Sequence, residues 1–512
     1  MNYLLGLDLG TTGSKTLIAD VNGRTIAQGY REYACTYPKP AWVEQDVDLV
    51  VAKSMEATKE VIEKTQIDPG DILAISLSSQ RCCTIPVDSQ GKLVRPMISW
   101  QDNRTLEEVE LIRKEISDRE FYEITGLPFN TTWMISKILW LKRHEPETMK
   151  RTAKIVQLHD YVLKAWGADD YYDDYSDASF YGLWDARTMS WHENLCQLIG
   201  LSQDQLPQVG PSGRVIGKLG KQAAECTGLR EGTPLCIGAG DQNSAAVGAG
   251  VVVPGTVNSS LGTGGAAITY ADAPFRDPNG KTMVTHHPIP GKWMIEGYQA
   301  GAASVYRWFR DEITSLEKSF ASCSKKDIYQ ILDEMVDQVP AGSKGLVLLP
   351  YFAGSAAPRW NPEARGTLLG LTFAHDRNCL VRAFMEGITL EVRDMLQSIR
   401  ESGFAISEVR VLGGPTKSKI WNQIQSDVYN CPVRTLKNTD AAVVGALIFA
   451  GLGAGVFSSI PEGCEKVVQI DETFTPNSGN VPIYDAAYDV FAKAYTALTD
   501  GGIFNAITKM QQ

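Results

Sequence analysis

Several features that would place the protein in another class are missing from the sequence. No uninterrupted apolar stretch reaches the roughly 20 residues that cross a bilayer as a helix, so a membrane protein is not expected. Positive charge is in the minority, because 49 Lys and Arg stand against 60 Asp and Glu and leave a formal net charge of -11. No basic stripe stands out along the chain, which argues against nucleic acid or a membrane surface as the partner.

Cysteine motifs and a secretory leader are missing as well. The 10 cysteines are scattered, with no C-x-x-C pair, and only Cys82 and Cys83 are adjacent. In a reducing compartment such residues act as small buried apolar groups rather than as metal ligands or disulfides. Met1-Asn2-Tyr3 leads directly into an apolar strand, without the basic segment and long apolar core of a secretory signal. We therefore expect a cytoplasmic protein.

The chain does contain enough material for two domains. Its 512 residues exceed what one hydrophobic core usually supports. A hydrophobic content of 44% and a charged content of 21% are ordinary for a globular protein. We expect one domain over residues 1–250 and a second over residues 251–512.

A tight glycine-rich loop follows the first predicted strand. Residues 6–15 read Gly-Leu-Asp-Leu-Gly-Thr-Thr-Gly-Ser-Lys and lie between two apolar runs. Glycines let backbone N–H groups point into one small space, and the hydroxyls of Thr11, Thr12 and Ser14 add donors that a phosphate accepts. Asp8 cannot bind a phosphate directly, but next to one it can hold Mg²⁺ through water. A plain β-hairpin with a glycine-rich turn is the alternative interpretation.

The loop occurs a second time far downstream. Residues 260–265 read Ser-Leu-Gly-Thr-Gly-Gly and repeat the Leu-Gly-Thr core of residues 9–11, again between β-prone runs. An internal repeat implies a repeated supersecondary unit. We therefore expect two related halves that face each other across one nucleotide, with Gly262 and Thr263 in the second phosphate loop.

Polar residues follow the buried strand that we predict over residues 72–77. Gln80 and Arg81 offer several hydrogen-bond donors, and Trp100, after the next predicted hairpin over residues 84–96, offers a flat apolar face. A compact polyhydroxylated molecule suits this combination, because its hydroxyls meet fixed polar groups while a C–H face lies on an indole ring. The alternative places Trp100 in the core and makes Arg104 a surface ion-pair partner.

A single carboxylate follows a second buried strand, predicted over residues 235–239. This strand delivers Asp241 among small residues, with Gln242 next to it. Phosphoryl transfer requires an in-line hydroxyl, a base that takes its proton, and cations and donors on the phosphate. Asp241 is our candidate for that base, and Gln242 is placed beside it at the substrate. Asp241 also suits the N-cap of a helix over residues 242–249, and both roles can hold together.

Together these motifs resemble the FGGY family of carbohydrate kinases, which includes glycerol kinase, xylulokinase, gluconokinase and autoinducer-2 kinase. The Gln80-Arg81 pair and the Trp-Gln-Asp pattern at Trp100 are most similar to glycerol kinase, whose Arg and Trp contact the polyol. Cys82 stands where glycerol kinase has a glutamate that binds its substrate, and Thr132 where a tyrosine would be. The motifs that carry the resemblance are the loop at residues 8–12, Gln80-Arg81, Trp100-Gln101-Asp102 with Arg104, Lys137 with Trp140, and Gly-Asp-Gln at Asp241.

The resemblance implies further site residues. It places adenine and ribose at Gly413 and Gly414, where glycines bring the backbone against a flat ring, with Lys417 close by. It also places the acidic, aromatic stretch in the middle of the chain near the sugar, which implies a supporting role for Asp174 or Ser176.

The resemblance also implies a fold and a reaction. The expected fold is α/β, with two actin-like ATPase (ribonuclease H-like) domains and an active-site cleft between them. The first domain should bind the sugar and the second the nucleotide. ATP should donate its γ-phosphate, with Mg²⁺ at Asp8 and Asp241, to a hydroxyl of a small keto-sugar or polyol. A xylulose-type pentulose is favoured over glycerol and the autoinducer-2 precursor, and a homodimer is a family expectation.

A nucleotide-switched, chaperone-like ATPase is the alternative from another functional class, since it shares the architecture. Gln80, Arg81 and Trp100 argue against it, because a chaperone does not need a polyol pocket beside a base. No peptide-binding β-domain follows in the sequence either.

Overall fold

The first sheet is built around the predicted phosphate-loop hairpin. The computed structural model describes residues 2–511. Within the sheet, β1 is antiparallel to β2 and parallel to β5, and β5 is in turn parallel to β14. In the spatial order β13-β14-β5-β1-β2-β3, the strands are Val215–Lys218, Pro234–Gly240, Ile72–Ser79, Tyr3–Leu9, Gly13–Asp20 and Thr25–Glu32.

The second sheet repeats this arrangement. β15 is antiparallel to β16 and parallel to β21, β21 is parallel to β22, and one further strand, β17, lies at the edge. The predicted internal repeat is therefore confirmed at the level of strand order and direction. In the order β17-β18-β16-β15-β21-β22-β23, the strands are Met283–His286, Trp293–Gln299, Gly265–Ala271, Thr256–Leu261, Glu408–Gly413, Val433–Leu436 and Ile470–Phe474.

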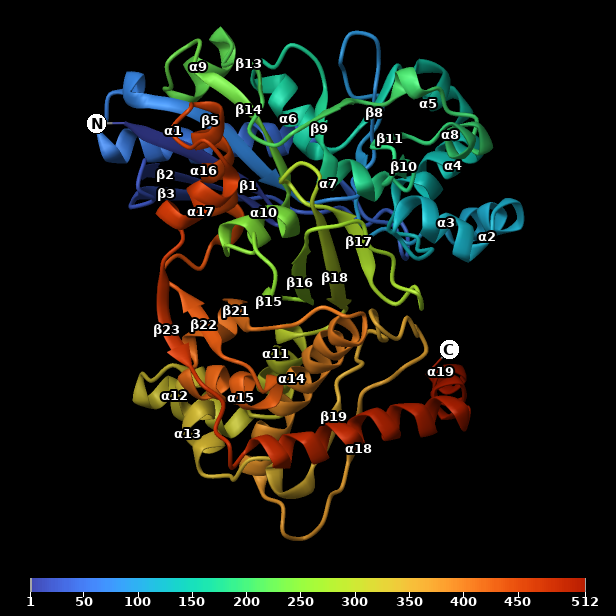
Figure 1. The fold of residues 1–512 in the computed structure, drawn as a ribbon, viewed down its shortest axis with the longest axis vertical. Helices are drawn as coiled ribbons and strands as arrows, with labels where there is room; N and C mark the ends of the chain where they lie inside the picture. The colour runs from blue at the N-terminus through green and yellow to red at the C-terminus, as the bar shows by residue number, and fades with distance from the viewer. Residues whose placement is uncertain (1, 512) are drawn as a thin grey trace.

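Helices pack on both sheets, and each half has its own hydrophobic core (Figure 1). α1 (Val47–Thr65) covers β2 and β3, and it begins where the Asp46 side chain accepts a hydrogen bond from the Leu49 N–H. α14 (Arg377–Glu401), the long amphipathic helix of the second half, is buried along most of its length. The other helices of the second half are α11 (Ala303–Glu312), α12 (Ser315–Ser324), α13 (Ile328–Asp337), α15 (Lys419–Tyr429), α18 (Val481–Asp500) and α19 (Ile503–Gln511).

A long insertion separates β5 from β14 and forms a lobe with its own apolar cluster. The hairpin predicted over residues 84–96 is present in the structure, because an antiparallel bridge joins Val87 to Leu93 and the Asp88 N–H donates to the Lys92 carbonyl at 2.9 Å. The prediction missed a second partner: β6 (Ile85–Val87) also pairs with β8 (Lys154–Val156), which lies far along the chain. The helices of the insertion are α2 (Leu106–Glu115), α3 (Asp118–Thr125), α4 (Met134–His144), α5 (Pro146–Arg151), α6 (Leu158–Trp166), α7 (Tyr175–Ala178), α8 (Glu193–Leu198) and α9 (Lys221–Thr227).

The chain returns to the first sheet near its end. α16 (Ala441–Gly453) packs on β1 and β5 and against α10 (Asp241–Gly248), and it is followed by α17 (Ile460–Val467). Figure 1 shows these orange-red helices beside the blue strands. Glycines allow the close approach of the two helices: a Cβ on Gly248 would lie 1.9 Å from the Ala441 carbonyl oxygen, and one on Gly445 would lie 2.1 Å from that of Ser244. Residues from both ends of the sequence thus share one core.

The remaining strands are short pairs outside the two large sheets: β4 (Glu44–Gln45) with β7 (Met97–Ile98), β9 (Tyr172–Asp174) with β12 (Gln208–Gly210), β10 (Trp184–Asp185) with β11 (Ser190–Trp191), and β19 (Val347–Leu349) with β20 (Thr367–Leu369). Among residues 2–511, no helix has the length and apolar character that crossing a membrane requires.

Candidate active site

Two hairpin loops lie at equivalent places in the two sheets. In the first, Leu9 pairs with Ser14, and the Gly10 N–H donates to the Gly13 carbonyl at 3.0 Å. In the second, Leu261 pairs with Gly265, and the Gly262 N–H donates to the Gly264 carbonyl at 2.9 Å. Both predicted loops are therefore tight hairpin turns at the same place in their sheets, and the second is one residue shorter than the first.

The first loop is tied to two of the predicted sugar residues. The Trp100 indole N–H donates to the Thr11 hydroxyl at 2.9 Å, and the Thr11 carbonyl accepts from Gln45 Nε2 at 2.6 Å. The Gln45 side-chain oxygen accepts in turn from Gln80 Nε2 at 2.7 Å. Trp100, Thr11 and Gln80 thus belong to one network, and Gln45, which the sequence analysis did not single out, connects them.

Two other residues of the first loop differ in their exposure to solvent. Thr12 is exposed, whereas Ser14 lies in β2 and is fully buried. The Ser14 hydroxyl has no hydrogen-bond partner within residues 2–511. Thr12 is thus the more accessible donor, and the ATP contact of Ser14 stays a prediction.

The second loop meets the predicted adenine and ribose residues. Gly413 pairs with Leu261 in the parallel β15–β21 register and has a φ of 93°. A Cβ there would lie 2.3 Å from the Leu261 carbonyl oxygen, so only glycine allows this approach. Gly262 and Gly414 are exposed nearby at the same sheet edge.

The segment after Gly413 reaches the next helix through a short turn. A short 3₁₀ turn over Gly414–Lys417 comes first, and α15 then begins behind its N-cap, Ser418. The side chain of Lys417 lies at the exposed surface of this turn. Its contact with ATP stays a prediction.

The N-terminus of α11 also lies against the second loop. The Thr263 carbonyl accepts from the Ala302 N–H at 3.0 Å and from the Ser304 hydroxyl at 2.6 Å. The Ala303 N–H donates to the Gly262 carbonyl at 2.9 Å. A helix N-terminus favours an anionic neighbour. The sequence analysis missed this element because its Gly-Ala-Ala-Ser start carries no distinctive motif.

Asp241 is the first residue of α10, directly after β14. Gly240, not Asp241, is the N-cap, so the capping interpretation is wrong. The Gln242 N–H donates to Asp241 Oδ1 at 2.7 Å, Arg81 Nε lies 3.4 Å from the same oxygen, and the Asp241 side chain is 30% exposed. Desolvation raises the pKa of Asp241, while the charge of Arg81 opposes the rise.

Arg81 is held mainly by protein groups. Its two terminal nitrogens donate to both carboxylate oxygens of Glu296, at 2.9 and 2.8 Å, and one of them also donates to Asn243 Oδ1 at 3.2 Å. The guanidinium carbon lies 4.1 Å from the centre of the Phe180 ring. Arg81 therefore sits beside Asp241 as predicted, but a direct contact with the sugar stays a prediction.

Asp8 lies close enough to Asp241 for the charges of the two carboxylates to interact. Asp8 Oδ1 accepts a hydrogen bond from the Ser78 hydroxyl at 2.9 Å. Burial, followed by the charge of Asp241, raises the pKa of Asp8 to about 7. A divalent cation would remove the repulsion between two such carboxylates, and carboxylate oxygen is the ligand that Mg²⁺ prefers. The two aspartates thus fit the predicted metal role.

Two further aspartates lie behind this site. Asp174 caps α7: its side chain accepts from the backbone and hydroxyl of Ser176 at 2.9 and 2.6 Å, so both have a structural role. Asp177 is fully buried, and neither of its carboxylate oxygens has a hydrogen-bond partner within residues 2–511. A Cβ on Gly240 would lie 3.2 Å from Asp177 Oδ1 and 2.5 Å from the Arg81 side chain. Asp177 therefore borders the site, although the sequence analysis did not select it.

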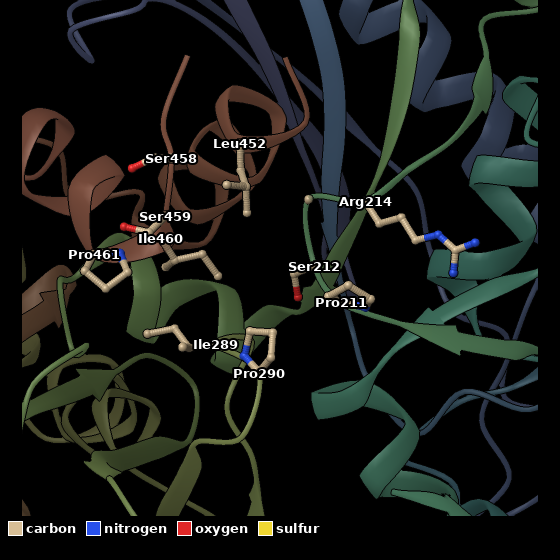
Figure 2. A pocket seen from close by; sticks show the side chains of 11 residues that line it. Pro211, Ser212, Arg214, Ile289, Pro290, Leu452, Ser458, Ser459, Ile460 and Pro461 are labelled. Carbon is tan, nitrogen blue, oxygen red and sulfur yellow. The ribbon is translucent and has the colours of Figure 1, made fainter. Parts of the chain in front are cut away.

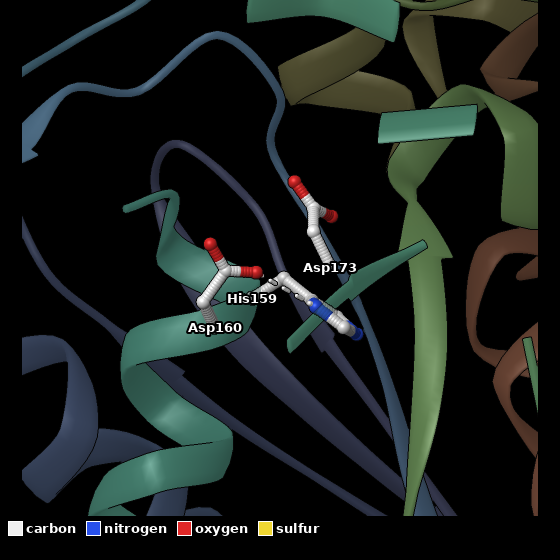
Figure 3. A group of neighbouring side chains, drawn as sticks. All are labelled: His159, Asp160 and Asp173. Atoms are coloured by element: carbon white, nitrogen blue, oxygen red, sulfur yellow. Dashed lines mark hydrogen bonds and ion pairs between the residues drawn. The ribbon is translucent and has the colours of Figure 1, made fainter. Parts of the chain in front are cut away.

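A buried histidine supports the strand that carries Asp241. Three side chains, His159, Asp160 and Asp173, have ligand atoms within 4.8 Å of one another, which is close enough for a metal (Figure 3). However, His159 Nε2 accepts from the Gly238 N–H at 2.8 Å, so Nδ1 carries the hydrogen and donates to Asp160 at 3.3 Å. One ring nitrogen thus holds the strand and the other bonds Asp160, so both are used in contacts within the protein and the cluster is structural.

The predicted motif residues beyond Trp100 are also structural. The Lys137 ammonium is fully buried and donates to the carbonyls of Cys82, Ser99 and Thr132 at 2.9, 2.8 and 2.9 Å. Arg104 forms an ion pair with Asp102 at 2.7 Å, but it is fully buried rather than on the surface. These residues fix the segment that delivers Trp100.

A cavity of about 380 Å³ lies elsewhere in the molecule, and none of the predicted site residues line it (Figure 2). Its apolar walls come from the turn before β13, from Ile289-Pro290 and from the ends of α16 and α17. The lining residues are Pro211, Ser212, Gly213, Arg214, Ile289, Pro290, Leu452, Ser458, Ser459, Ile460 and Pro461.

Comparison with known proteins agrees with this arrangement. Residues 3–248 match the N-terminal domain of the FGGY family of carbohydrate kinases, and residues 257–454 match its C-terminal domain. The chain therefore belongs to the FGGY family of carbohydrate kinases. It is an ATP-dependent phosphotransferase that acts on a sugar, which excludes the chaperone-like alternative.

Relatives cover nearly the whole chain. It is 30% identical to a xylulose kinase of Bacillus subtilis, over 98% of each chain, and 28% identical to a gluconokinase of the same organism, again over 98% of each. It is also 30% identical to an autoinducer-2 kinase of Salmonella typhimurium, over 99% of this chain and 97% of that one. The crystal structure of ligand-bound xylulose kinase from Lactobacillus acidophilus superposes with a TM-score of 0.90 at 25% identity, covering 98% of this chain and 99% of that one. The two-domain α/β fold is thereby confirmed.

Proposed function

We propose that the protein phosphorylates a small, uncharged keto-sugar of the xylulose type, with Asp241 as the general base. The observation that carries this proposal is the position of Asp241, directly after β14, with Arg81 Nε 3.4 Å from its carboxylate and with Asp8 close enough for their charges to interact. In this proposal residues 1–250 bind the sugar, while residues 251–512 bind ATP through Gly262, Thr263, Gly413 and Gly414.

The chemical step follows from these positions. A sugar hydroxyl attacks the γ-phosphorus of ATP, a new O–P bond forms, and the bond to the bridging oxygen breaks so that ADP leaves with its electrons. Asp241 accepts the hydroxyl proton as this happens. A carboxylate whose pKa is raised by burial is a better proton acceptor than an exposed one. Arg81 keeps Asp241 in place, and its charge limits the rise in the pKa of Asp241.

Asp8 and Asp241 would hold Mg²⁺, which neutralises phosphate charge when bound. The exposed amides and hydroxyls of the two loops, among them Thr12 and Thr263, would contact the phosphates, and the N-terminus of α11 favours the same anion. Because the reaction uses ATP, we expect the enzyme to work in the cytoplasm. A homodimer is retained as a family expectation.

Charge around the site supports an uncharged acceptor. Arg81, the cation beside Asp241, is already neutralised by the bidentate carboxylate of Glu296. Gluconate would bring another carboxylate close to Asp241, where Arg81 is already in contact with Asp241 and Glu296. Xylulose and the linear autoinducer-2 precursor carry no such charge. The contacts of Arg81 therefore disfavour a sugar acid as the acceptor.

A substrate panel tests the proposal directly. ADP release should be measured with xylulose and other pentuloses, glycerol, erythritol, gluconate and the linear autoinducer-2 precursor. We expect a pentulose to give the highest kcat/KM and gluconate to give one of the lowest. Preference for gluconate would overturn the charge argument, and preference for glycerol would overturn the inference from Cys82. Absence of turnover with every acceptor would overturn the proposed reaction itself.

A further inference from the structure

A carboxylate from the second sheet holds the guanidinium of Arg81. Glu296 lies in β18, within an otherwise uncharged strand, and its side chain is only 2% exposed. Arg81 follows β5 in the first half, 215 positions earlier in the sequence. The two side chains form two parallel hydrogen bonds of 2.9 and 2.8 Å, so the contact is bidentate.

This geometry fixes the orientation of Arg81. A planar guanidinium bound through both terminal nitrogens cannot rotate freely, and such forks are stronger and more directional than single contacts. The remaining nitrogen, Nε, then faces Asp241 Oδ1 at 3.4 Å. Removing the carboxylate would leave a buried arginine with only Asp241 as its acidic partner in this contact set, and the guanidinium would turn toward it.

Asn243 extends the same arrangement to α10. Its side-chain oxygen accepts from Arg81 at 3.2 Å, and its amide nitrogen lies 3.3 Å from the sulfur of Met294. Met294 and Glu296 both belong to β18. The strand therefore contacts Arg81 and the helix that begins with Asp241 at the same time.

We propose that Glu296 is a positioning residue for phosphoryl transfer, which acts through Arg81 to place the carboxylate of Asp241. This inference rests on the proposed function, in which Asp241 is the base. Because β18 is the direct neighbour of β16, which leaves the second phosphate loop, Glu296 connects the sheet that binds ATP to the base in the other half. A correctly placed base then depends on the correct placement of both halves.

Replacement of Glu296 by glutamine tests the proposal, since E296Q keeps the size of the side chain and removes its charge. With the best acceptor of the panel, we expect kcat to fall by about tenfold or more while the KM for ATP stays within about twofold. Glu296→Asp, which retains the charge on a shorter side chain, should recover part of the loss. A kcat for E296Q within about twofold of the wild type would overturn the proposal.

A matched control separates positioning from stability. Asp394 receives a bidentate contact from Arg359, at 2.7 and 2.9 Å, and lies in the second half outside the site. Asp394→Asn should lower the melting temperature but leave kcat near the wild-type value. An equal loss of kcat in both variants would show that E296Q acts through general destabilisation, which contradicts the proposal.

A double-mutant cycle tests the route through Arg81. If Glu296 acts only through Arg81, R81Q/E296Q should be no slower than R81Q alone, whereas independent effects would multiply. Multiplication would overturn the proposed route. The outcome is distinct from a failure of the proposed function, which would show as near-native turnover of Asp241→Asn, or as no turnover with any acceptor.

Discussion

The two sheets share one strand order but carry different residues at equivalent strand ends. In the first sheet Leu9 pairs with Ser79, and Gln80-Arg81 follows. In the second sheet Leu261 pairs with Gly413, and Gly414-Pro415 follows. Long polar side chains in one half thus stand where the other half has almost no side chain at all.

The difference indicates how one scaffold serves two ligands. The first half supplies charged and polar side chains, with Asp8 at the position where the second half has Ser260. The second half supplies mostly backbone at these positions, which in our proposal lets it approach the flat base and the phosphates of ATP closely. Side-chain substitutions in the first half should therefore change kcat and the kcat/KM for the sugar. Side chains added in the second half should change the KM for ATP.

The largest effect should come from Asp241 in the first half. Asp241→Asn removes the proton acceptor but keeps the shape of the side chain, so kcat should fall by about 10² or more. Steady-state kinetics and a nucleotide titration would check this, with ATP affinity expected to stay near its wild-type value. Near-native turnover would mean that another group is the base.

Truncation of Arg81 should have the next largest effect. Arg81→Ala leaves Glu296 buried without its partner and releases Asp241, so we expect a loss of roughly 1–3 kcal/mol in kcat/KM for the sugar. The KM for ATP in the same variant serves as the internal control. If only the KM for ATP rose, the result would contradict the proposal that the first half binds the sugar and the second half binds ATP.

A methyl group added in the second half should instead raise the KM for ATP. Gly413→Ala places a Cβ 2.3 Å from the Leu261 carbonyl, which forces the two nucleotide segments apart. We expect the KM for ATP to rise about tenfold, equivalent to about 1.4 kcal/mol, with an unchanged KM for the sugar.

Gly403→Ala is the matched control for Gly413→Ala, because Gly403 has a φ of 92° but no atom within 4 Å of an added Cβ. It carries the same backbone strain without the collision. Its KM for ATP should equal that of the wild type. An equal rise in both variants would show that strain alone, and not the approach of the two segments, is responsible.

The smallest effect should be a dependence of the Mg²⁺ requirement on pH. With its pKa raised to about 7, Asp8 is protonated below that pH and charged above it, and only the charged form binds a cation well. The Mg²⁺ concentration for half-maximal activity should therefore be a few-fold higher at pH 6 than at pH 8. Asp8→Asn, assayed in the same buffers, should lose the pH dependence that Asp8 contributes. The pH dependence that remains in this variant is the part due to the titration of ATP itself. Identical pH profiles for both enzymes would contradict a metal role for Asp8.

Much of the fold was predictable because its signals are local. Each phosphate loop is a short hairpin between apolar runs, and its repetition at residues 260–265 predicted the second sheet. The strand that ends at Asp241 was likewise marked by a continuous apolar run. The pairing of β6 with β8 was not predictable, because β8 lies far along the chain and no turn signal connects the two strands.

The parts of the site that escaped prediction depend on contacts between distant segments. Glu296 is one acidic residue in an apolar strand, and nothing near it in the sequence connects it to Arg81. Asp177 and His159 look like ordinary members of a polar stretch until the fold encloses them. Gln45 is bound to Thr11 and Gln80, yet it lies between them in the sequence without a motif of its own.

The return of α16 to the first sheet has a consequence for the order in which the protein is made. Leu4, Leu17 and Ala74 pack in one cluster with Val443 and Leu447, which the ribosome adds only after most of the second half. During synthesis one apolar face of the first sheet therefore stays exposed until α16 has been made. Until then this face can bind chaperones or form premature contacts. The amino-terminal half becomes complete only when the carboxyl-terminal half is nearly finished.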